Sequence, residues 1–423
     1  MKGVKGKGLF LTIIISIFFT TSFALVPLEW DYRAFDDFNV ENSFNFGMRR
    51  SQLFFLEMGV DGNTNQNMLP LFEFMDVLGS DTIDLSKYSK TIMNNIGDGP
   101  AVGGGFVRGL GNFGLKIAPR MAVGVYADAK LDAGFSIPNW IMEVLLEGNE
   151  LIKYPKYDEE GPILDSSVSV GGMMGFDLGW GFASFGVGAY GPLMYGTLDR
   201  YAELNATPTA AGTVSLDATV YSPIDVDLMD FSNIKLEELD LGGIFSGVKT
   251  DFSVVAGKDI PICGVTVRDI PITSAELRYS ANLFDVSATF TSNPPGFATD
   301  TTIPDNISLT KMGTPTEYWI KPTVSAFVNF PFSRYFSMVV HTNSSQLAGT
   351  YVGASLNANM ADAMIWTLDL TTSSDGSMMY SGGLAIHNDL NTIKVNGGIG
   401  TAKPFDFSTV TAPRFSISTS INF

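Results

Sequence analysis

The two histidines are the residues in this sequence best suited to acid and base catalysis, and each lies near the end of a predicted strand. The positions two residues beyond His341 and His387 hold Asn343 and Asp389. A hydrolase would instead need a serine within hydrogen-bond reach of the imidazole on the same face. The alternative that a serine on a neighbouring strand reaches the imidazole stays open, because it depends on the register of the strands. We interpret both histidines as residues of solvated strand ends, and we expect neither a catalytic residue nor an enzyme.

The hexapeptide GLGNFG at 109–114 matches the spacing of a dinucleotide-binding loop. In that motif the glycines follow a strand and open a helix, whose N-terminus holds the pyrophosphate. Here the glycines are followed by LKIAPRMAVGVYADAKLDAGF, which is typical of a strand. In a barrel wall, glycine marks a bend or makes room for an inner side chain. The sequence therefore predicts no nucleotide site and no cofactor.

The stretch DGNTNQN at 61–67 begins with the ligand spacing of a calcium loop, Asp61, Asn63 and Asn65. The sixth position of such a loop is glycine and the twelfth is glutamate. These positions hold Gln66 and Phe72 here. We interpret the stretch as a solvated loop and expect no specific metal site.

The first 24 residues have the three parts of an export signal. Three lysines precede the apolar run from Leu9 to Phe19, and Ser22-Phe23-Ala24 supplies the small residues that a signal peptidase reads. The alternative is a membrane anchor, but the run is shorter than the ~20 residues that a spanning helix needs. We expect the mature chain to begin near Leu25.

Composition favours many strands and turns over long helices. Only 17% of the residues are charged, 12% are aromatic, and there are 44 glycines and 20 prolines. The formal net charge is −18, which disfavours nucleic acid and anionic lipid headgroups as partners. Cys263 is the single cysteine of the sequence, so no intramolecular disulfide can form.

Segments with a two-residue period follow one another along most of the chain. No apolar stretch of 18 residues occurs after the export signal, so any crossing of a membrane must use strands. We predict about 14–16 segments of roughly ten residues, the length of a tilted bilayer-spanning strand. A β-sandwich array or a β-helix also alternates, but sandwich strands are shorter and a β-helix needs a short repeat that is absent. The predicted fold is all-β: a transmembrane, antiparallel, up-and-down β-barrel, closed because hydrocarbon does not tolerate an open sheet edge.

The last ten residues, RFSISTSINF, place bulky apolar residues at nearly every second position. This ending resembles the C-terminal strand of outer-membrane β-barrel proteins of diderm bacteria, which commonly finishes on phenylalanine. The resemblance implies a place in the cell outer membrane, with outer-membrane lipid and the barrel assembly machinery as partners. It also implies that Phe415, Ile417, Ile421 and Phe423 form the assembly signal.

Several segments break the two-residue period. Residues 84–96 and 138–147 show helical spacing and predict short helices, which pack over the barrel rim or within their loops unless one of them enters the lumen or the outer leaflet. Within residues 49–78, RRSQLFFLEMGV is compatible with a strand, but we interpret the segment as a long loop, with or without a third helix; 223–245 predict an excursion from the wall. The predicted organisation is a signal peptide at 1–24, a hatch or plug with the first strands at 25–100, and a transmembrane barrel at 101–423.

Three functions remain open for such a barrel. The first is a channel for passive uptake of small, hydrophobic molecules. The overall plan, the glycine-rich GGGFVRGLGNFG and the hatch-length segment 25–100 resemble the FadL-like channels for hydrophobic compounds. The Asn-Pro-Ala stretch usual in that family near the mature N-terminus is missing, so the resemblance implies neither fatty-acid specificity nor ligand-contacting residues. The others are a general diffusion porin and a surface-exposed adhesin or structural barrel.

The channel and the porin differ in what the inner wall should carry. A porin needs acidic and basic residues that face each other in the lumen, and the candidates are Lys116, Arg120, Asp128, Lys130, Asp132, Arg278 and Lys394. These charges are sparse. Phe185, Phe327 and Met379 are predicted on inward faces, which favours a hydrophobic ligand.

Overall fold

The computed structural model describes residues 53–70, 73, 88–147, 157–204, 212–225, 241–257, 261–292, 295–302, 308–332, 336–345, 349–360, 364–373, 378–387, 391–401 and 410–422. The predicted export signal at 1–24, the predicted helix within 49–78 apart from residue 73, and the final Phe423 lie outside these ranges. Within the described residues, no helix is both long and apolar enough to span a membrane.

Eighteen strands and three helices make up the described structure. Their bounds, in chain order, are β1 Phe54–Gln66, α4 Ser89–Ile96, β2 Ala101–Ala118, β3 Met121–Ile137, α5 Asn139–Glu147, β4 Tyr157–Asp177, β5 Gly181–Leu204, β6 Gly212–Ser222, α6 Leu241–Ile244, β7 Gly247–Ala256, β8 Cys263–Thr273, β9 Ala275–Ser292, β10 Pro295–Thr302, β11 Thr310–Tyr318, β12 Thr323–Pro331, β13 Phe336–Ser345, β14 Gly349–Met360, β15 Met364–Ser373, β16 Met378–His387, β17 Asn391–Thr401 and β18 Val410–Asn422.

Antiparallel pairings join fourteen of these strands into a ring. The pairings run through β1, β2, β3, β4, β5, β7, β8, β12, β13, β14, β15, β16, β17 and β18, and β18 pairs with β1 again. A ring has no free edge, so every wall strand has a hydrogen-bonding neighbour on both sides. The predicted all-β antiparallel barrel of about 14–16 strands is confirmed.

The other four strands, β6, β9, β10 and β11, are not part of the ring. At one level along the height of the barrel, strands of the ring either end or change their pairing partner, and the chain continues there into strands outside the ring. The first half of β5 pairs with β7 and its second half with β6. β9 follows β8 after the single residue Ser274, and β11 precedes β12 by four residues. Residues 223–246 separate β6 from β7 and carry α6 near their end, and residues 226–240 of the predicted excursion lie outside the described residues.

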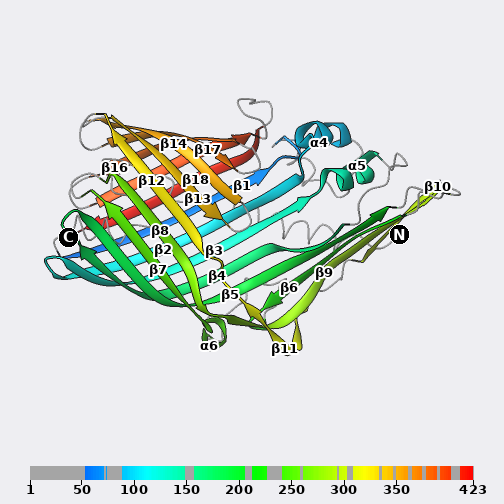
Figure 1. Cartoon of the computed structure of the whole chain (residues 1–423), viewed down its shortest axis with the longest axis horizontal. Helices are drawn as coiled ribbons and strands as arrows, with labels where there is room; N and C mark the ends of the chain where they lie inside the picture. Colours follow the sequence, from blue (N-terminus) through cyan, green and yellow to red (C-terminus); the bar gives the residue numbers. More distant parts are fainter. Residues whose placement is uncertain are drawn as a thin grey trace.

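Beyond this level, a second sheet continues from the ring. We call it the projecting sheet: the first half of β4 and the second half of β5, followed by β6, β9 and β10, with β11 beside the start of β9. Figure 1 shows it reaching beyond the ring, with β10 at its tip. The same end, which we call the loop end, carries α4 and α5.

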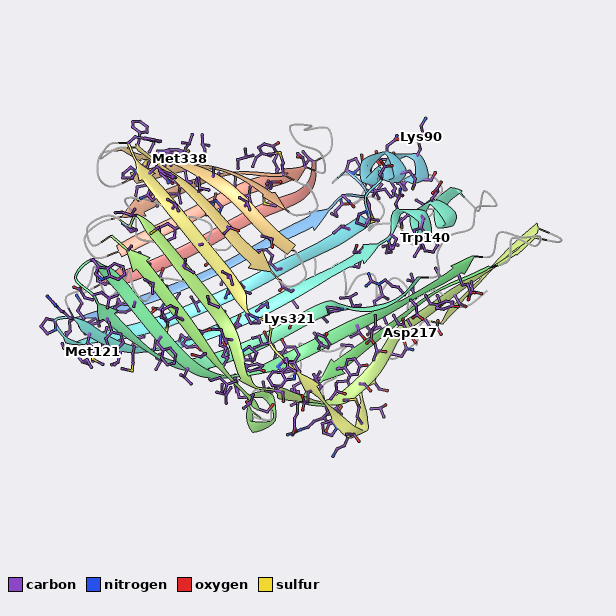
Figure 2. All side chains as sticks on the ribbon, in the orientation of Figure 1. Lys90, Met121, Trp140, Asp217, Lys321 and Met338 are labelled. Carbon is purple, nitrogen blue, oxygen red and sulfur yellow. The ribbon has the colours of Figure 1, made fainter. Side chains whose placement is uncertain are left out.

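The opposite end, here the turn end, holds the start of β1 and the finish of β18, because Phe55 pairs with Asn422. Short connections join the strands there, such as the two residues between β2 and β3. In Figure 2, Met121 lies at this end and Asp217 lies on the projecting sheet.

The helices α4 and α5 confirm the two predicted helical segments. Ile92 and Ile96 of α4 pack with Met142 of α5, Leu69 and Ala101 in one buried cluster. The side-chain amide of Gln66 accepts the backbone N–H groups of Met68 and Leu69, which ends β1 in a tight turn beside this cluster. The helices therefore pack on each other beside the rim of the β2–β3 hairpin.

Candidate functional site

The outer face of the ring is apolar. Alternation along each strand places one set of side chains outward, and this set is rich in large, exposed hydrophobic residues. Examples are Val60, Phe113, Val125, Val170, Phe185, Phe252, Val265, Val328, Val340, Leu356, Leu368 and Val395. A soluble protein rarely exposes so continuous an apolar belt, whereas a membrane-spanning barrel requires one.

The inner face carries polar and charged residues that are buried inside the ring. Nine charged side chains gather on it between β2 and β8, and we call this set the interior charge cluster: Arg108, Asp128, Lys130, Asp132, Asp165, Lys249, Asp251, Arg268 and Asp269. Eight of them are at most 7% exposed, and the side chain of Lys130 is 9% exposed. The cluster contains five carboxylates and four of the cations of the inner wall.

Lys249 of β7 is the centre of this cluster and is fully buried. Its Nζ lies 2.5 Å from Asp269 Oδ1, 3.5 Å from Asp251 Oδ2 and 3.9 Å from Asp128 Oδ2. Nζ also lies 5.3 Å from the centroid of the Tyr126 ring, a cation–π distance. A buried ammonium group is tolerated only when it is paired in this way.

The remaining cations of the cluster pair with its other carboxylates. Arg268 donates from Nη2 to Asp128 Oδ2 at 2.8 Å, and Arg108 Nε lies 3.4 Å from Asp128 Oδ1. Lys130 Nζ lies 3.5 Å from Asp132 and 3.9 Å from Asp165. Each cation of the cluster is therefore paired with a carboxylate inside the barrel.

An irregularity in β8 lets two consecutive residues contribute to the cluster. The β7–β8 register shifts between Thr250 and Phe252, and Asp269 has a φ of 57°, a left-handed conformation unusual for a residue other than glycine. Its backbone N–H donates to Asp251 Oδ1 at 2.8 Å. Arg268 and Asp269 thus both reach the cluster, although adjacent strand residues normally face opposite sides.

A second polar group lies on the β13–β16 part of the inner wall and centres on Asp369. His341 Nε2 lies 2.9 Å from Asp369 Oδ1, and the Ser355 hydroxyl donates to the same oxygen at 2.7 Å. The hydroxyls of Thr371 and Ser381 donate to Oδ2 at 2.8 and 3.4 Å. We call these five residues the Asp369 network.

The Asp369 network corrects the expectation for His341. This histidine is 2% exposed and sits within β13, not at a solvated strand end. Gly353 lies opposite it in β14, where a Cβ would come within 2.6 Å of the imidazole, so the glycine makes room for the ring. The nearby serine, Ser355, directs its hydroxyl at the carboxylate. The sequence did not reveal this pairing because Asp369 is two strands away.

Two apolar clusters lie on the inner wall nearer the turn end. Phe55, Ala122 and Phe182 form one buried cluster, with Met173 against it. Val255, Phe327 and Val339 form another. Phe327 lies over Gly264 of β8, where a Cβ would come within 2.5 Å of its ring. Toward the turn end, the inner wall therefore combines these apolar clusters with buried polar residues such as Asn329, Ser337 and Asn357, and with Glu57.

Tyrosines fill the level at which the wall strands are interrupted. The ring centroids of Tyr195 and Tyr318 are 5.6 Å apart, and those of Tyr190 and Tyr318 are 6.2 Å apart. Tyr190 donates its hydroxyl to the Thr273 carbonyl at 2.8 Å, and Tyr318 donates to Asp165 at 2.5 Å. These contacts connect the base of the projecting sheet to the interior charge cluster.

The structure sorts the predicted charges into three groups. Asp128, Lys130 and Asp132 lie in the interior charge cluster. Lys116 is half-buried in β2 and Arg120 is exposed in the β2–β3 turn. Arg278 forms an exposed ion pair with Glu276 on β9, at 3.1 Å, and the side chain of Lys394 lies outside the described residues.

Six members of the cluster were missed: Arg108, Asp165, Lys249, Asp251, Arg268 and Asp269. The available signal was a charged pair within an otherwise apolar strand, as in VKTDFSVV and VTVRDIPI. Such a pattern is costly in a membrane strand unless the charges face inward and meet partners.

Two of the three predicted inward apolar residues are confirmed. Phe327 and Met379 are 4% and 7% exposed. Phe185 was placed wrongly: it is 46% exposed, because Ser184 and Gly186 occupy the inner face of β5. Because both faces of this glycine-rich strand carry small residues, its sequence did not show which face points inward.

The two motifs that suggested ligands are ordinary strand segments. GLGNFG lies within β2, and Asp61, Asn63 and Asn65 lie within β1. An extended strand cannot fold around a calcium ion or present a helix N-terminus to a phosphate. In the part of the chain that the structure describes, no group of three or more His, Cys, Asp or Glu residues is arranged to hold a metal ion.

The closed ring and its apolar outer belt define a class of protein: the chain is an antiparallel transmembrane β-barrel. No family model matches the sequence, and no curated protein matches it either. Among solved structures, a Pseudomonas aeruginosa FadL homologue is similar, with 10% identity, a TM-score of 0.43, and coverage of 95% of this chain and 98% of the other.

Two further similar structures are of proteins named for the aromatic hydrocarbons they transport. The Pseudomonas putida toluene transporter TodX has 8% identity, a TM-score of 0.34, and coverage of 90% of this chain and 92% of the other. The CymD monoaromatic hydrocarbon channel has 8% identity, a TM-score of 0.30, and coverage of 95% and 98%. Likeness at this level says nothing about what this chain carries.

Proposed function

We propose that the chain is an outer-membrane channel for the passive uptake of small, hydrophobic molecules. The observation that carries the proposal is the inner wall. The cations of the interior charge cluster are paired with carboxylates and buried, whereas Phe55, Phe182 and Phe327 line the wall toward the turn end and Met379 is buried on the inner wall near the loop end. A passing molecule would therefore meet apolar side chains and few accessible charges, which favours a hydrophobic one.

A general diffusion porin is the alternative, and the inner charges argue against it. A porin holds its acidic and basic residues on facing sides of an open constriction, where they act on passing solutes. Here Arg268 and Arg108 contact Asp128 directly, so their fields largely cancel. A porin would show a large and steady conductance in a planar bilayer.

Display at the cell surface is favoured by one observation, the projecting sheet. It extends beyond the ring (Figure 1), and its outward residues Asp158, Glu160, Asp199 and Asp285 are exposed. Such a face belongs in water and not in lipid. An adhesin or structural barrel would still lack the uptake activity tested below.

The proposal is tested by uptake of a fluorescent long-chain alcohol into cells with and without the protein. Phe327→Thr adds a polar group to the inner apolar wall, and we expect it to lower the uptake rate several-fold. Phe330→Thr is the matched control, because Phe330 lies on the same strand but is 44% exposed on the outer face. Equal uptake with and without the wild-type protein would refute the proposal.

Export and assembly belong to the same proposal. The backbone register places Ile417 opposite Val60 of β1 and Val395 of β17, both exposed on the outer face, so β18 is the strand that closes the ring. We propose that Phe415, Ile417, Ile421 and Phe423 form the signal read by the barrel assembly machinery. Deletion of Phe423 should reduce the amount of folded protein in the outer membrane. The N-terminus of the purified protein should lie near Leu25.

A further inference from the structure

The contacts of the interior charge cluster join strands that are not neighbours in the wall. Arg268 of β8 bonds to Asp128 of β3, although β4, β5 and β7 lie between them. Tyr126 of β3 donates its hydroxyl to Asp251 of β7 at 2.8 Å. Ladder hydrogen bonds cannot make such connections, so these bonds hold distant parts of the wall together across the inside of the barrel.

The wall beneath the cluster is built so that these bonds can form. Gly171 of β4 and Gly188 of β5 lie opposite Tyr126 and Lys249 along one row of the register. A Cβ on Gly171 would come within 2.6 Å of the Tyr126 ring, and one on Gly188 within 2.5 Å of its hydroxyl. The two glycines let the tyrosine lie flat along the wall and reach Asp251.

The cluster also excludes water. Lys249, Asp165 and Asp269 are each 0% exposed, so the space between the bonded strands is filled by protein atoms. Ion pairs in such a dry site are strong, and an unpaired ion entering it loses its hydration shell without gaining a partner.

From these three observations we propose that the interior charge cluster is a seal against polar solutes. Arg268 and Asp128 are the specificity-determining residues, since their bond joins the most distant wall strands of the cluster. The cluster narrows the interior by tying β3 to β7 and β8, and the apolar clusters that would contact a hydrophobic molecule lie nearer the turn end. This inference rests on the proposed channel function, and the test separates the two.

The test replaces both members of the key bond. Arg268→Gln with Asp128→Asn removes the ionic attraction and leaves neither partner as an isolated buried charge. The control is Arg278→Gln with Glu276→Gln, an ion pair of similar length on the exposed face of β9. Swelling of proteoliposomes in sugars of increasing size measures polar permeation, and uptake of the fluorescent alcohol is measured on the same preparation.

We expect the wild-type protein and the control to admit sugars slowly and the Arg268–Asp128 variant to admit them several-fold faster. Unchanged sugar permeation in a folded variant would overturn the seal, while alcohol uptake by the wild type would still support the channel. Rapid sugar entry through the wild type would also overturn the seal. Absence of alcohol uptake by the wild type would instead count against the channel.

Folding of the variant is checked by its heat-dependent mobility on a gel. If the double variant does not fold, Tyr126→Phe removes only the Tyr126–Asp251 bond and gives the same readout. A seal predicts a smaller rise in sugar permeation for this variant, and no rise would overturn the proposal.

Discussion

The interior charge cluster and the outer face of the projecting sheet differ in the surroundings of their carboxylates, which are paired with cations in the cluster and lie next to other carboxylates on the sheet. In the cluster, Asp128, Asp251 and Asp269 surround Lys249 and are almost fully buried. On the projecting sheet, Glu160, Asp199, Asp217 and Asp285 lie directly opposite one another on four successive strands. We call these four residues the acidic row.

The difference teaches how solvent decides which arrangement is stable. Inside the barrel, a carboxylate without a cation would lose its hydration at a cost of several kcal/mol, so each has a partner. Water solvates the acidic row and lowers the repulsion between its members. The same residue type therefore contributes strongly to folding in one region and weakly in the other.

Lys249→Met should have the largest effect, because it removes the buried cation that pairs with Asp251 and Asp269, while Asp128 keeps Arg268 and Arg108. We expect a loss of about 3–5 kcal/mol, enough to prevent folding of a marginal barrel. Urea unfolding in detergent micelles, followed by tryptophan fluorescence, measures the loss. Lys311→Met on the exposed part of β11 is the control, and we expect a change of less than about 0.5 kcal/mol. Equal stability of both variants would contradict the comparison.

Asp369→Ala should have the next largest effect. It removes the acceptor shared by His341, Ser355 and Thr371, and leaves buried donors without their partner at a cost of about 1–3 kcal/mol. Asp369→Asn keeps one acceptor oxygen and should lose less. The same urea titration ranks the two variants, and equal losses would show that the charge of Asp369, which both variants remove, governs this network rather than hydrogen bonding.

Tyr126→Phe should cost about 1 kcal/mol, the contribution of one buried hydrogen bond. Tyr201→Phe is the comparison, because Tyr201 donates to Glu203 on the projecting sheet and both side chains are only half-buried. We expect a smaller loss there, since water replaces the bond. A larger loss for Tyr201→Phe would reverse the contrast between the two regions.

Asp217→Asn should have the smallest effect and the opposite sign. Partial burial raises the pKa of Asp217 above its ordinary value of 3.8, and Asp285 and Asp199 raise it further. A raised pKa means that the folded state binds the proton more tightly, so stability falls as the pH rises through that pKa. Asparagine removes this loss. We expect a gain of ~0.3 kcal/mol at neutral pH and none below pH 3.8, which thermal unfolding at both pH values checks.

Much of the fold could be predicted from the sequence because alternation is a local property. The segment TVSAFVNFP shows its faces directly, and the structure confirms Val324 and Val328 outside and Ser325 and Phe327 inside. The ring size followed from segment counting. The interruption of the wall strands did not, because a break such as Ser274 between β8 and β9 leaves the local pattern of both strands intact.

The candidate site was less predictable because its contacts are between distant residues. Arg268 and Asp128 are separated by 140 residues, and only the ring closure brings them together. Asp269 could not be placed inward by alternation, since its left-handed backbone breaks the rule that alternation uses. The sequence shows neither the register of the strands nor the curvature of the sheet. The charges within single strands therefore could not be assigned to one common cluster.

The level at which the wall strands are interrupted has a consequence for how this barrel can vary. The ring keeps all its pairings within β1–β5, β7, β8 and β12–β18, and the projecting sheet joins it through the continuations of β4, β5, β8 and β12. The ring and the sheet are thus separable modules with four fixed junctions. A descendant of this chain could lengthen, shorten or exchange the sheet at those junctions while the transmembrane part stayed unchanged.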